Sequence, residues 1–479
     1  MLDPDAVEHV LKQSDPDAYV RRILAGFLEV PFHLSLAQIR SAESLAEPAP
    51  ALAAPLGGFV DARDYAAEVE ILVDASTTQA PAGDIADFIR YFNDRYDQLG
   101  RLVRRRREVA HAVPLNRVKE SGKEVAMIGL VDDVSKAPKS GHRFLTLEDT
   151  TGSAEVLVHA NRADLVAMAD TLLSDEVIGV VAKASKDGGL LIADQIIRPE
   201  IPWRAENRAQ LEAPVHAAFL GDIHIGSKTF LDGPFQKMIK WLHGEDGPAQ
   251  ERALARSIKY LVLPGDVVDG VGVYPGQEDS LSIPDVLEQY RQLSRELERA
   301  PRHLHTVILP GNHDASRPTE PQPAFNQEIR GFFEGMETTF VSNPSTFSLH
   351  GRRVLAYHGF SMIDFATKVP GLSLERPTEI MKQMLACRHV APSYGAKTPV
   401  APDARDRLTI SLEPDIFATG HVHVVGNDRY RGVALVNGGT WQAQTSYQKM
   451  HNLTPTPAVL PVMNLQTLNT TRIDFSGHA

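Results

Sequence analysis

The chain has 479 residues, of which 43% are hydrophobic and 23% are charged. This composition is typical of globular proteins and excludes disorder over most of the length, and the length indicates two or three domains. A formal net charge of -12 argues against a protein that coats nucleic acid by diffuse positive charge. The single cysteine, Cys387, excludes a disulfide within the chain and a metal site built of cysteines.

The first forty residues have the apolar spacing of helices, which predicts a helical region over 1–41. Residues 42–58 are rich in Ala and Pro and are predicted to form a linker. The start of the chain lacks the basic and apolar stretches of a secretory signal, and no apolar run reaches the ~18–20 residues of a membrane span. We therefore expect a cytoplasmic protein with no membrane partner.

Residues 59–115 are predicted to form a helical segment with an arginine cluster. From Asp84, which is placed to cap a helix, apolar residues recur on one face as far as Val103. The helix leads into five arginines with no acidic residue among them: Arg101, Arg104, Arg105, Arg106 and Arg107. Two interpretations weigh about equally, a solvated helix end that favours cations, or a patch that contacts phosphate or a partner.

Residues 116–203 have the alternating pattern of five short strands, with a helical stretch from Asn161 to Leu172 after the third strand. This order predicts an OB-fold β-barrel. Such barrels bind single strands by stacking bases on aromatic residues, but this segment offers little beyond Phe144. We therefore expect the barrel to serve as a scaffold or a protein contact.

Residues 214–479 contain short apolar strands, each followed by a polar loop, which predicts an α/β domain with its site at the strand ends. Five of these loops hold a glycine beside carboxylate, amide or imidazole groups. They are Gly221-Asp222-Ile223-His224, Gly265-Asp266-Val267-Val268-Asp269-Gly270, Gly311-Asn312-His313-Asp314, Tyr357-His358-Gly359 and Gly420-His421-Val422-His423. One such cluster is usually an ordinary turn, but five in order indicate a site for manganese, iron or zinc.

These clusters resemble the metal-binding motifs of the calcineurin-like metallophosphoesterase superfamily, in family order and with no ligand missing. The resemblance implies a multidomain protein in which an α/β phosphoesterase β-sandwich flanked by helices follows the OB-fold barrel and the helical N-terminal region. It implies two divalent ions with one shared carboxylate: Asp222, His224 and His423 for the first ion, Asn312, His358 and His421 for the second, and Asp266 between them. It also makes His313 the catalytic histidine that faces phosphate, with Asp269 and Asp314 orienting the histidines or their loops.

Each part of the implied metal site has a chemical role in the hydrolysis of phosphate esters. Two cations roughly 3.5 to 4 Å apart neutralise phosphate oxygens and lower the pKa of a bridging water. A nearby imidazole that protonates the leaving oxygen adds about 10²- to 10⁴-fold in rate. Such a site hydrolyses phosphate esters, and we expect manganese in it, with iron and zinc as alternatives.

The sequence around these clusters resembles the small subunits of archaeal D-family DNA polymerases, from about residue 84 to the C-terminus. The stretches that carry the resemblance are YFNDRYDQLGRLVRRR, RHVAPSYGAKTPVAPDARDRLTI and NGGTWQAQTSYQKMHNLTPTPAVLPVMNL. It implies a metal-dependent, proofreading 3′-to-5′ exonuclease acting on DNA 3′ ends. It also implies a partner, the large subunit that holds the polymerase site, and a need for the small subunit in full DNA synthesis. The sequence leaves open whether a sliding clamp is a further partner.

Two alternatives remain open from the sequence. One is a non-catalytic assembly subunit with a vestigial metal site, which the complete ligand set argues against. The other is a different dinuclear-metal phosphoesterase, such as a repair nuclease or a phosphatase, in which the phosphoesterase domain usually opens the chain. After the last of the apolar strands, the stretch from Trp441 to Thr445 and the polar pair Tyr447-Gln448 could be part of a docking or DNA-facing surface. For Trp441 itself, a packed core aromatic is slightly favoured.

Overall fold

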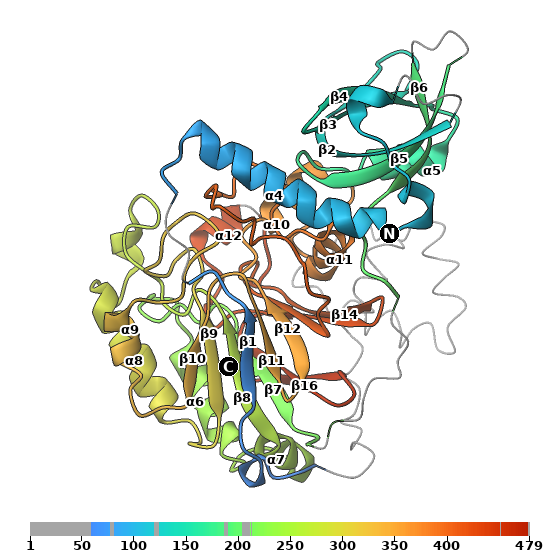
Figure 1. The fold of residues 1–479 in the computed structure, drawn as a ribbon. Helices are drawn as coiled ribbons and strands as arrows, with labels where there is room; N and C mark the ends of the chain where they lie inside the picture. Colours follow the sequence, from blue (N-terminus) through green and yellow to red (C-terminus); the bar gives the residue numbers. More distant parts are fainter. Residues whose placement is uncertain are drawn as a thin grey trace, which may run out of the picture. The chain divides into compact units, whose positions relative to one another are not determined.

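The structure is a computed structural model and describes residues 59–477 apart from 77–80, 119–123, 186–189, 204–210, 212 and 451. The predicted helical region 1–41 and linker 42–58 lie outside the described residues. The described chain forms two six-stranded sheets with surrounding helices and a closed five-stranded barrel (Figure 1). The prediction of a multidomain α/β protein with a β-barrel is therefore confirmed. None of the described helices is both long and apolar enough to cross a membrane.

Both sheets are mixed and have parallel strands at their centres. In order, the first sheet contains β1 (Val69–Val73), β11 (Ser345–Leu349), β12 (Arg352–Ala356), β13 (Ile416–Thr419), β15 (Val433–Gly438) and β14 (Val425–Tyr430). The second contains β10 (Thr338–Phe340), β9 (His305–Leu309), β8 (Ile258–Pro264), β7 (His216–Phe219), β16 (Val459–Asn464) and β17 (Thr470–Asp474). The strands β12, β13 and β15 run parallel, as do β7 to β10. Their carboxyl ends are where such sheets place their sites.

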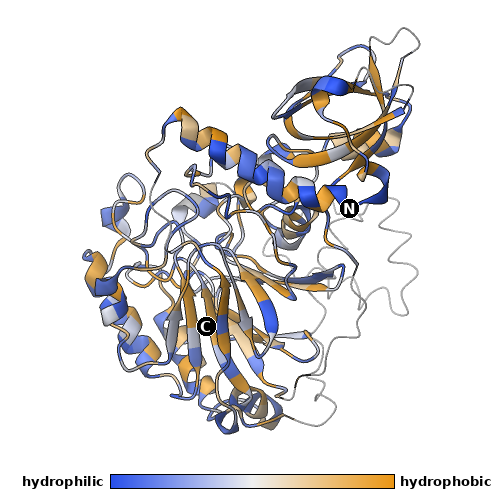
Figure 2. Cartoon of the chain, viewed as in Figure 1, coloured by the Kyte–Doolittle hydropathy of each residue, from blue (hydrophilic) through white to orange (hydrophobic). Residues whose placement is uncertain are grey.

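The core of this domain lies between the two sheets. Fully buried side chains from both sheets, such as Phe219, Val262 and Val436, belong to one apolar cluster, and Figure 2 shows hydrophobic residues concentrated along the strands. The helices are α6 (Asp232–Leu242), α7 (Ala249–Arg256), α8 (Val286–Glu298), α9 (Gln327–Gly331), α10 (Met362–Lys368), α11 (Pro377–Cys387) and α12 (Ser446–Met450). A second cluster joins α10 and α11 to residues of β12, β13 and β15. Strands covered on both faces explain the continuous apolar runs in the sequence.

One strand occurs where the sequence predicted only helix. Strand β1 lies within the segment 59–115 and pairs with β11 as an antiparallel edge strand. Just before it, the backbone of Glu68 exchanges two hydrogen bonds with the Tyr260 hydroxyl. The helical prediction is therefore wrong for residues 69–73. The segment is short and half-buried, and it forms a strand because it pairs with a strand far along the chain. Its own residue pattern therefore gives little indication of β-structure.

The barrel has the strand order predicted from the sequence. Its strands are β2 (Glu124–Lys136), β3 (Arg143–Asp149), β4 (Gly152–Val158), β5 (Val177–Ala184) and β6 (Leu191–Ile197). They pair in the order β2-β3-β4-β6-β5 and close through β5 with β2. The helix α5 (Ala163–Ala169) lies between β4 and β5 in sequence, as in an OB-fold. Apolar side chains such as Met127 and Val156 form the barrel's own core.

The predicted amphipathic helix is α4 (Ile85–Arg104). Asp84 caps it by accepting from the backbone of Asp87, whose side chain reaches back to the cap backbone. Its last turns pack Leu99 and Val103 against β2 and β5 of the barrel. Ile85 and Ile89, both predicted on the apolar face, are exposed instead. The middle of α4 buries a charged residue that the apolar pattern did not include.

That residue is Arg95, which is completely buried and links three parts of the chain. Its Nε donates to Asp406 Oδ2 at 2.6 Å, and its Nη1 donates to the carbonyls of Asp175 at 3.1 Å and Pro392 at 2.5 Å. Burial alone would raise the pKa of Asp406, but His389 and Arg95 hold it below its usual range. This buried ion pair fixes α4 and the barrel to the two-sheet domain.

Replacing Asp406 tests the ion pair. Asp406→Asn should lower the free energy of unfolding at pH 7 by about 3 kcal/mol, because Arg95 stays buried without its counter-charge. Since folding lowers the pKa of Asp406, its contribution is present above the unfolded value of about 3.9 and is lost as the pH falls toward the folded value. Chemical denaturation should therefore show wild type and variant converging below about pH 4.

The matched control is Asp97→Asn, an exposed position on the same helix. An Asp406→Asn variant as stable at pH 7 as this control would contradict the role given to the ion pair.

Candidate metal centre

The predicted ligands lie in five loops at the carboxyl ends of parallel strands. They follow β7 (Asp222, His224), β8 (Asp266), β9 (Asn312), β12 (His358) and β13 (His421, His423). Two strand sets from two different sheets therefore place their polar loops at one site. Asp222 and His358 are fully buried there.

Five of the seven predicted ligands have a left-handed backbone. Their φ angles lie between 47° and 70°, and the residues are Asp222, His224, Asp266, His421 and His423. Residues other than glycine rarely adopt this conformation, which costs of order 1 kcal/mol or more. Strain gathered at one place is typical of a functional site, because the surrounding structure must impose it.

The first ligand set brings two imidazole nitrogens face to face. His224 Nε2 lies 3.1 Å from His423 Nε2, which lies 3.7 Å from Asp222 Oδ1. Burial, and then the nearby His224, lower the pKa of His423 well below its usual value. The imidazole of His423 is therefore neutral, the form that a metal ion requires.

The second set surrounds His358. Its Nδ1 donates to the Pro264 carbonyl at 2.9 Å, and its Nε2 lies 2.9 Å from Asn312 Oδ1 and 3.2 Å from His421 Nδ1. Burial, and then His358, lower the pKa of His421 to about 3. An amide oxygen and two imidazole nitrogens thus converge.

Asp266 touches both sets. Its Oδ2 lies 3.3 Å from His358 Nε2 and 3.8 Å from His224 Nε2. Burial alone would raise its pKa, but His358 and His313 hold the pKa well below the usual range. The residue therefore keeps a charged carboxylate between the two ligand sets, which is the position of a bridging ligand.

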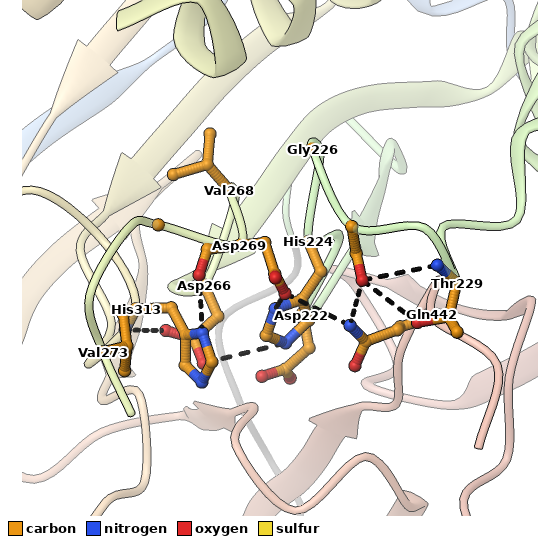
Figure 3. A network of polar contacts seen from close by, with 12 residues as sticks. Asp222, His224, Gly226, Thr229, Asp266, Val268, Asp269, Val273, His313 and Gln442 are labelled. Atoms are coloured by element: carbon orange, nitrogen blue, oxygen red, sulfur yellow. Dashed lines mark hydrogen bonds and ion pairs between the residues drawn. The ribbon is translucent and has the colours of Figure 1, made fainter. Parts of the chain in front are cut away.

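His313 lies at the edge of this arrangement with a fixed tautomer. Its backbone N–H donates to Asp266 Oδ1 at 2.8 Å, and its Nδ1 donates to the Asp269 carbonyl at 2.8 Å (Figure 3). The ring packs edge-on against His224, with 4.7 Å between centroids. Nε2 is then the nitrogen available for proton transfer.

Asp269 contacts one predicted ligand, and Asp314 contacts the loop that carries another. Asp269 Oδ1 lies 3.0 Å from His224 Nδ1 (Figure 3). Asp314 Oδ2 accepts from the Gly311 N–H at 2.8 Å, next to Asn312. Burial, followed by the charge of Asp266, raises the pKa of Asp314 to about 7. Both aspartates position the site without reaching its centre.

Three buried amide side chains complete the support, and two of them, Gln442 and Gln448, belong to the stretch that was predicted as a possible docking or DNA-facing surface. Gln442 Nε2 donates to Asp269 Oδ1 at 3.2 Å, Gln448 lies 2.8 Å from His423 Nδ1, and Asn343 Oδ1 accepts from the His358 N–H at 2.8 Å. The sequence did not predict these contacts, because isolated amides form no motif. The surface role predicted for Gln442 and Gln448 is wrong, since both side chains are buried.

Trp441, beside Gln442, is fully buried and packs edge-on against Phe235. The interpretation of Trp441 as a core aromatic is confirmed, and the docking or DNA-facing alternative is wrong for this residue.

The arginine cluster is not part of this site. It lies at the end of α4 and in the short helix η2 (Arg107–Val109), which packs beside β2 and β5. Four of its five residues are exposed. Arg104 donates to the Ala112 carbonyl and Arg106 to the Glu200 carbonyl, and within the described ranges none of the five forms an ion pair. A role in phosphate or partner contact stays a prediction.

The residues at the centre fit divalent metal ions. Histidine and carboxylate donor atoms within 4.8 Å of one another form the groups Asp222-His224-His423 and Asp266-His358-His421. Mixed nitrogen and oxygen donors of this kind suit manganese, iron and zinc. The two-sheet α/β architecture, with such ligand sets around one carboxylate at its strand ends, is the arrangement expected from the resemblance to calcineurin-like metallophosphoesterases.

Comparison with known proteins narrows the class to a family. Residues 217–424 match the family of DNA polymerase alpha/epsilon B subunits. The DNA polymerase II small subunit of Methanothermobacter thermautotrophicus is 41% identical over 403 residues, which cover 84% of this chain and 82% of that protein. The same protein of Methanocaldococcus jannaschii is 39% identical over 409 residues, which cover 84% of this chain and 68% of that protein. The DNA polymerase II small subunit of Halobacterium salinarum is 39% identical over 418 residues, which cover 86% of this chain and 79% of that protein. The chain belongs to the family of archaeal DNA polymerase II small subunits.

Replacing Asp269 tests how the site is supported. Asp269→Asn should weaken binding of Mn²⁺ by about 10- to 100-fold, because the carboxylate that orients His224 is lost. Isothermal titration of the metal-free full chain with MnCl₂ measures the effect. Asp279→Asn, an exposed aspartate in the following loop, is the matched control. Equal affinities for the two variants would contradict the role given to Asp269.

Proposed function

We propose that this chain is the small subunit of a two-subunit archaeal replicative DNA polymerase and that its metal centre removes nucleotides from the 3′ end of DNA. The observation that carries the proposal is the convergence of the six other predicted ligands around Asp266, with His313 beside them. The proposed role in DNA replication follows from the family to which the chain belongs. The metal is proposed to be manganese, with iron and zinc as alternatives that the same donors accept.

Two bound cations would neutralise the scissile phosphate and activate a water molecule. One ion would be held by Asp222, His224 and His423, and the other by Asn312, His358 and His421. Asp266 would bind both ions. Water attacks phosphorus, and the bond to the 3′ oxygen of the preceding nucleotide breaks. His313 in its imidazolium form would give that oxygen the proton on Nε2, while its Nδ1–H stays hydrogen-bonded to the Asp269 carbonyl. The products are a nucleoside 5′-monophosphate and a shortened strand with a free 3′ hydroxyl.

The two alternatives fit the site less well. A vestigial centre would have no reason to retain five strained ligand backbones. A separate repair nuclease or phosphatase is disfavoured by the similarity to the polymerase small subunits, which extends over 84% of the chain. The barrel supports a second, structural role, since its own core is complete and it is joined to the phosphoesterase domain through Arg95.

Removing ligands tests the exonuclease. Asn312→Ala and His423→Ala should each reduce Mn²⁺-dependent digestion of a 5′-labelled single strand by about 100-fold or more, because charge stabilisation at the phosphate is lost. Circular dichroism should show an intact fold, and the exposed His111→Ala is the matched control. Undiminished digestion by a purified double variant would contradict the proposal. Metal analysis of the wild-type protein distinguishes an active metal centre from a vestigial one, because a vestigial centre would hold almost no metal.

The partner proposed for this chain is the large subunit of the same polymerase. When the two chains are co-expressed, they should elute as one complex from a sizing column. DNA synthesis by the large subunit should rise when the small subunit is added. Separate elution with unchanged synthesis would contradict the assembly role and leave the metal chemistry unaffected.

A further inference from the structure

A loop beside the metal centre exposes three apolar side chains. Val271, Val273 and Tyr274 are 48%, 37% and 44% exposed, and they follow directly after the loop of Asp266 and Asp269. Single exposed apolar residues are ordinary, but a group of them at the edge of a polar site marks a binding surface. The proposed hydrolysis makes no use of them.

The loop is held in place at both ends. Gly270 has a φ of 73°, and a Cβ there would overlap the backbone carbonyl of His313. The side chain of Gln289 accepts from the Gly270 N–H at 2.9 Å and donates to its carbonyl at 3.1 Å. At the other end, the fully buried Gln277 accepts from the Val273 N–H at 2.8 Å. The apolar group therefore has a defined position relative to His313.

Tyr274 brings an aromatic face next to the reacting groups. Its ring centroid lies 6.4 Å from that of His313, with an angle of 64° between the rings. Val273, on the same loop, is labelled beside His313 in Figure 3. An exposed aromatic ring within a nucleotide's length of a phosphodiester site suits the flat face of a nucleobase, and such stacking is tolerant of sequence.

We propose that Tyr274, flanked by Val271 and Val273, stacks on a nucleobase at the 3′ end of single-stranded DNA and so holds the terminal phosphodiester at the metal centre. The inference rests on the proposed exonuclease function and identifies its substrate as an unpaired end, because a base inside a duplex has both faces covered. Stacking would add affinity for DNA to a chain whose net charge of -12 opposes diffuse electrostatic binding.

The test compares two 5′-labelled single strands that differ only in the last nucleotide, which is either normal or an abasic tetrahydrofuran residue. With Mn²⁺ and the full chain, wild type should remove the normal nucleotide about fivefold or more faster than the abasic one. Tyr274→Ala should slow removal of the normal nucleotide to the abasic rate and leave the abasic rate unchanged. Tyr274→Phe should behave as wild type, because it keeps the ring.

The matched control is Tyr394→Ala, which removes another exposed tyrosine whose ring contacts Phe88 and Phe92. Equal rates on both strands for wild type and Tyr274→Ala would overturn the stacking inference while the exonuclease stands. No digestion of either strand by wild type would overturn the exonuclease proposal itself. If Tyr274→Ala no longer binds the large subunit but keeps the preference for the normal strand, the loop is a protein contact and stacking is overturned.

Discussion

The carboxylate of Asp266, shared by two buried ligand sets, is the constraint on which the rest of the structure depends. A charged carboxylate is stable in a buried place only where opposite charge or hydrogen bonds compensate it. Here the compensation comes from His358 and His313 in the protein, and two cations would complete it. Asp266 stands in the loop just after β8, a strand at the middle of its sheet, so loops from both sheets can reach it. The left-handed backbones of neighbouring ligands are a cost of that convergence.

The remainder of the molecule makes this centre rigid. The apolar core between the sheets fixes the strand ends, and amide side chains such as Gln442 hold the groups behind the ligands. The buried pair of Arg95 and Asp406 joins α4 and the barrel to the same domain. In the proposed hydrolysis, a preorganised site of this kind would place charge where it develops, so the acidity of the chain as a whole would not oppose the reaction. The net negative charge opposes diffuse binding of DNA only.

Much of this could be predicted from the sequence because the ligands are local motifs. Each of the five clusters stands directly after an apolar strand, so the order of strands and the meeting of their loops follow from the pattern. The cap at Asp84 and the strand order of the barrel are also local signals. The edge strand β1 could not be predicted, since its partner β11 comes far later in the chain. The exposure of Ile85 and the burial of Arg95 were missed for the same reason, because the surface that α4 covers is set by tertiary contacts. Support from Gln442, Gln448 and Asn343 likewise exists only in three dimensions.

The shared carboxylate is tested most directly by anomalous diffraction from crystals of the full chain grown with MnCl₂ and measured at the manganese absorption edge. The account predicts two peaks roughly 3.5 to 4 Å apart, with one oxygen of Asp266 ligating each ion or a single oxygen ligating both. One ion should contact Asp222, His224 and His423, and the other Asn312, His358 and His421. A single peak, or two peaks that do not share Asp266, would contradict the account.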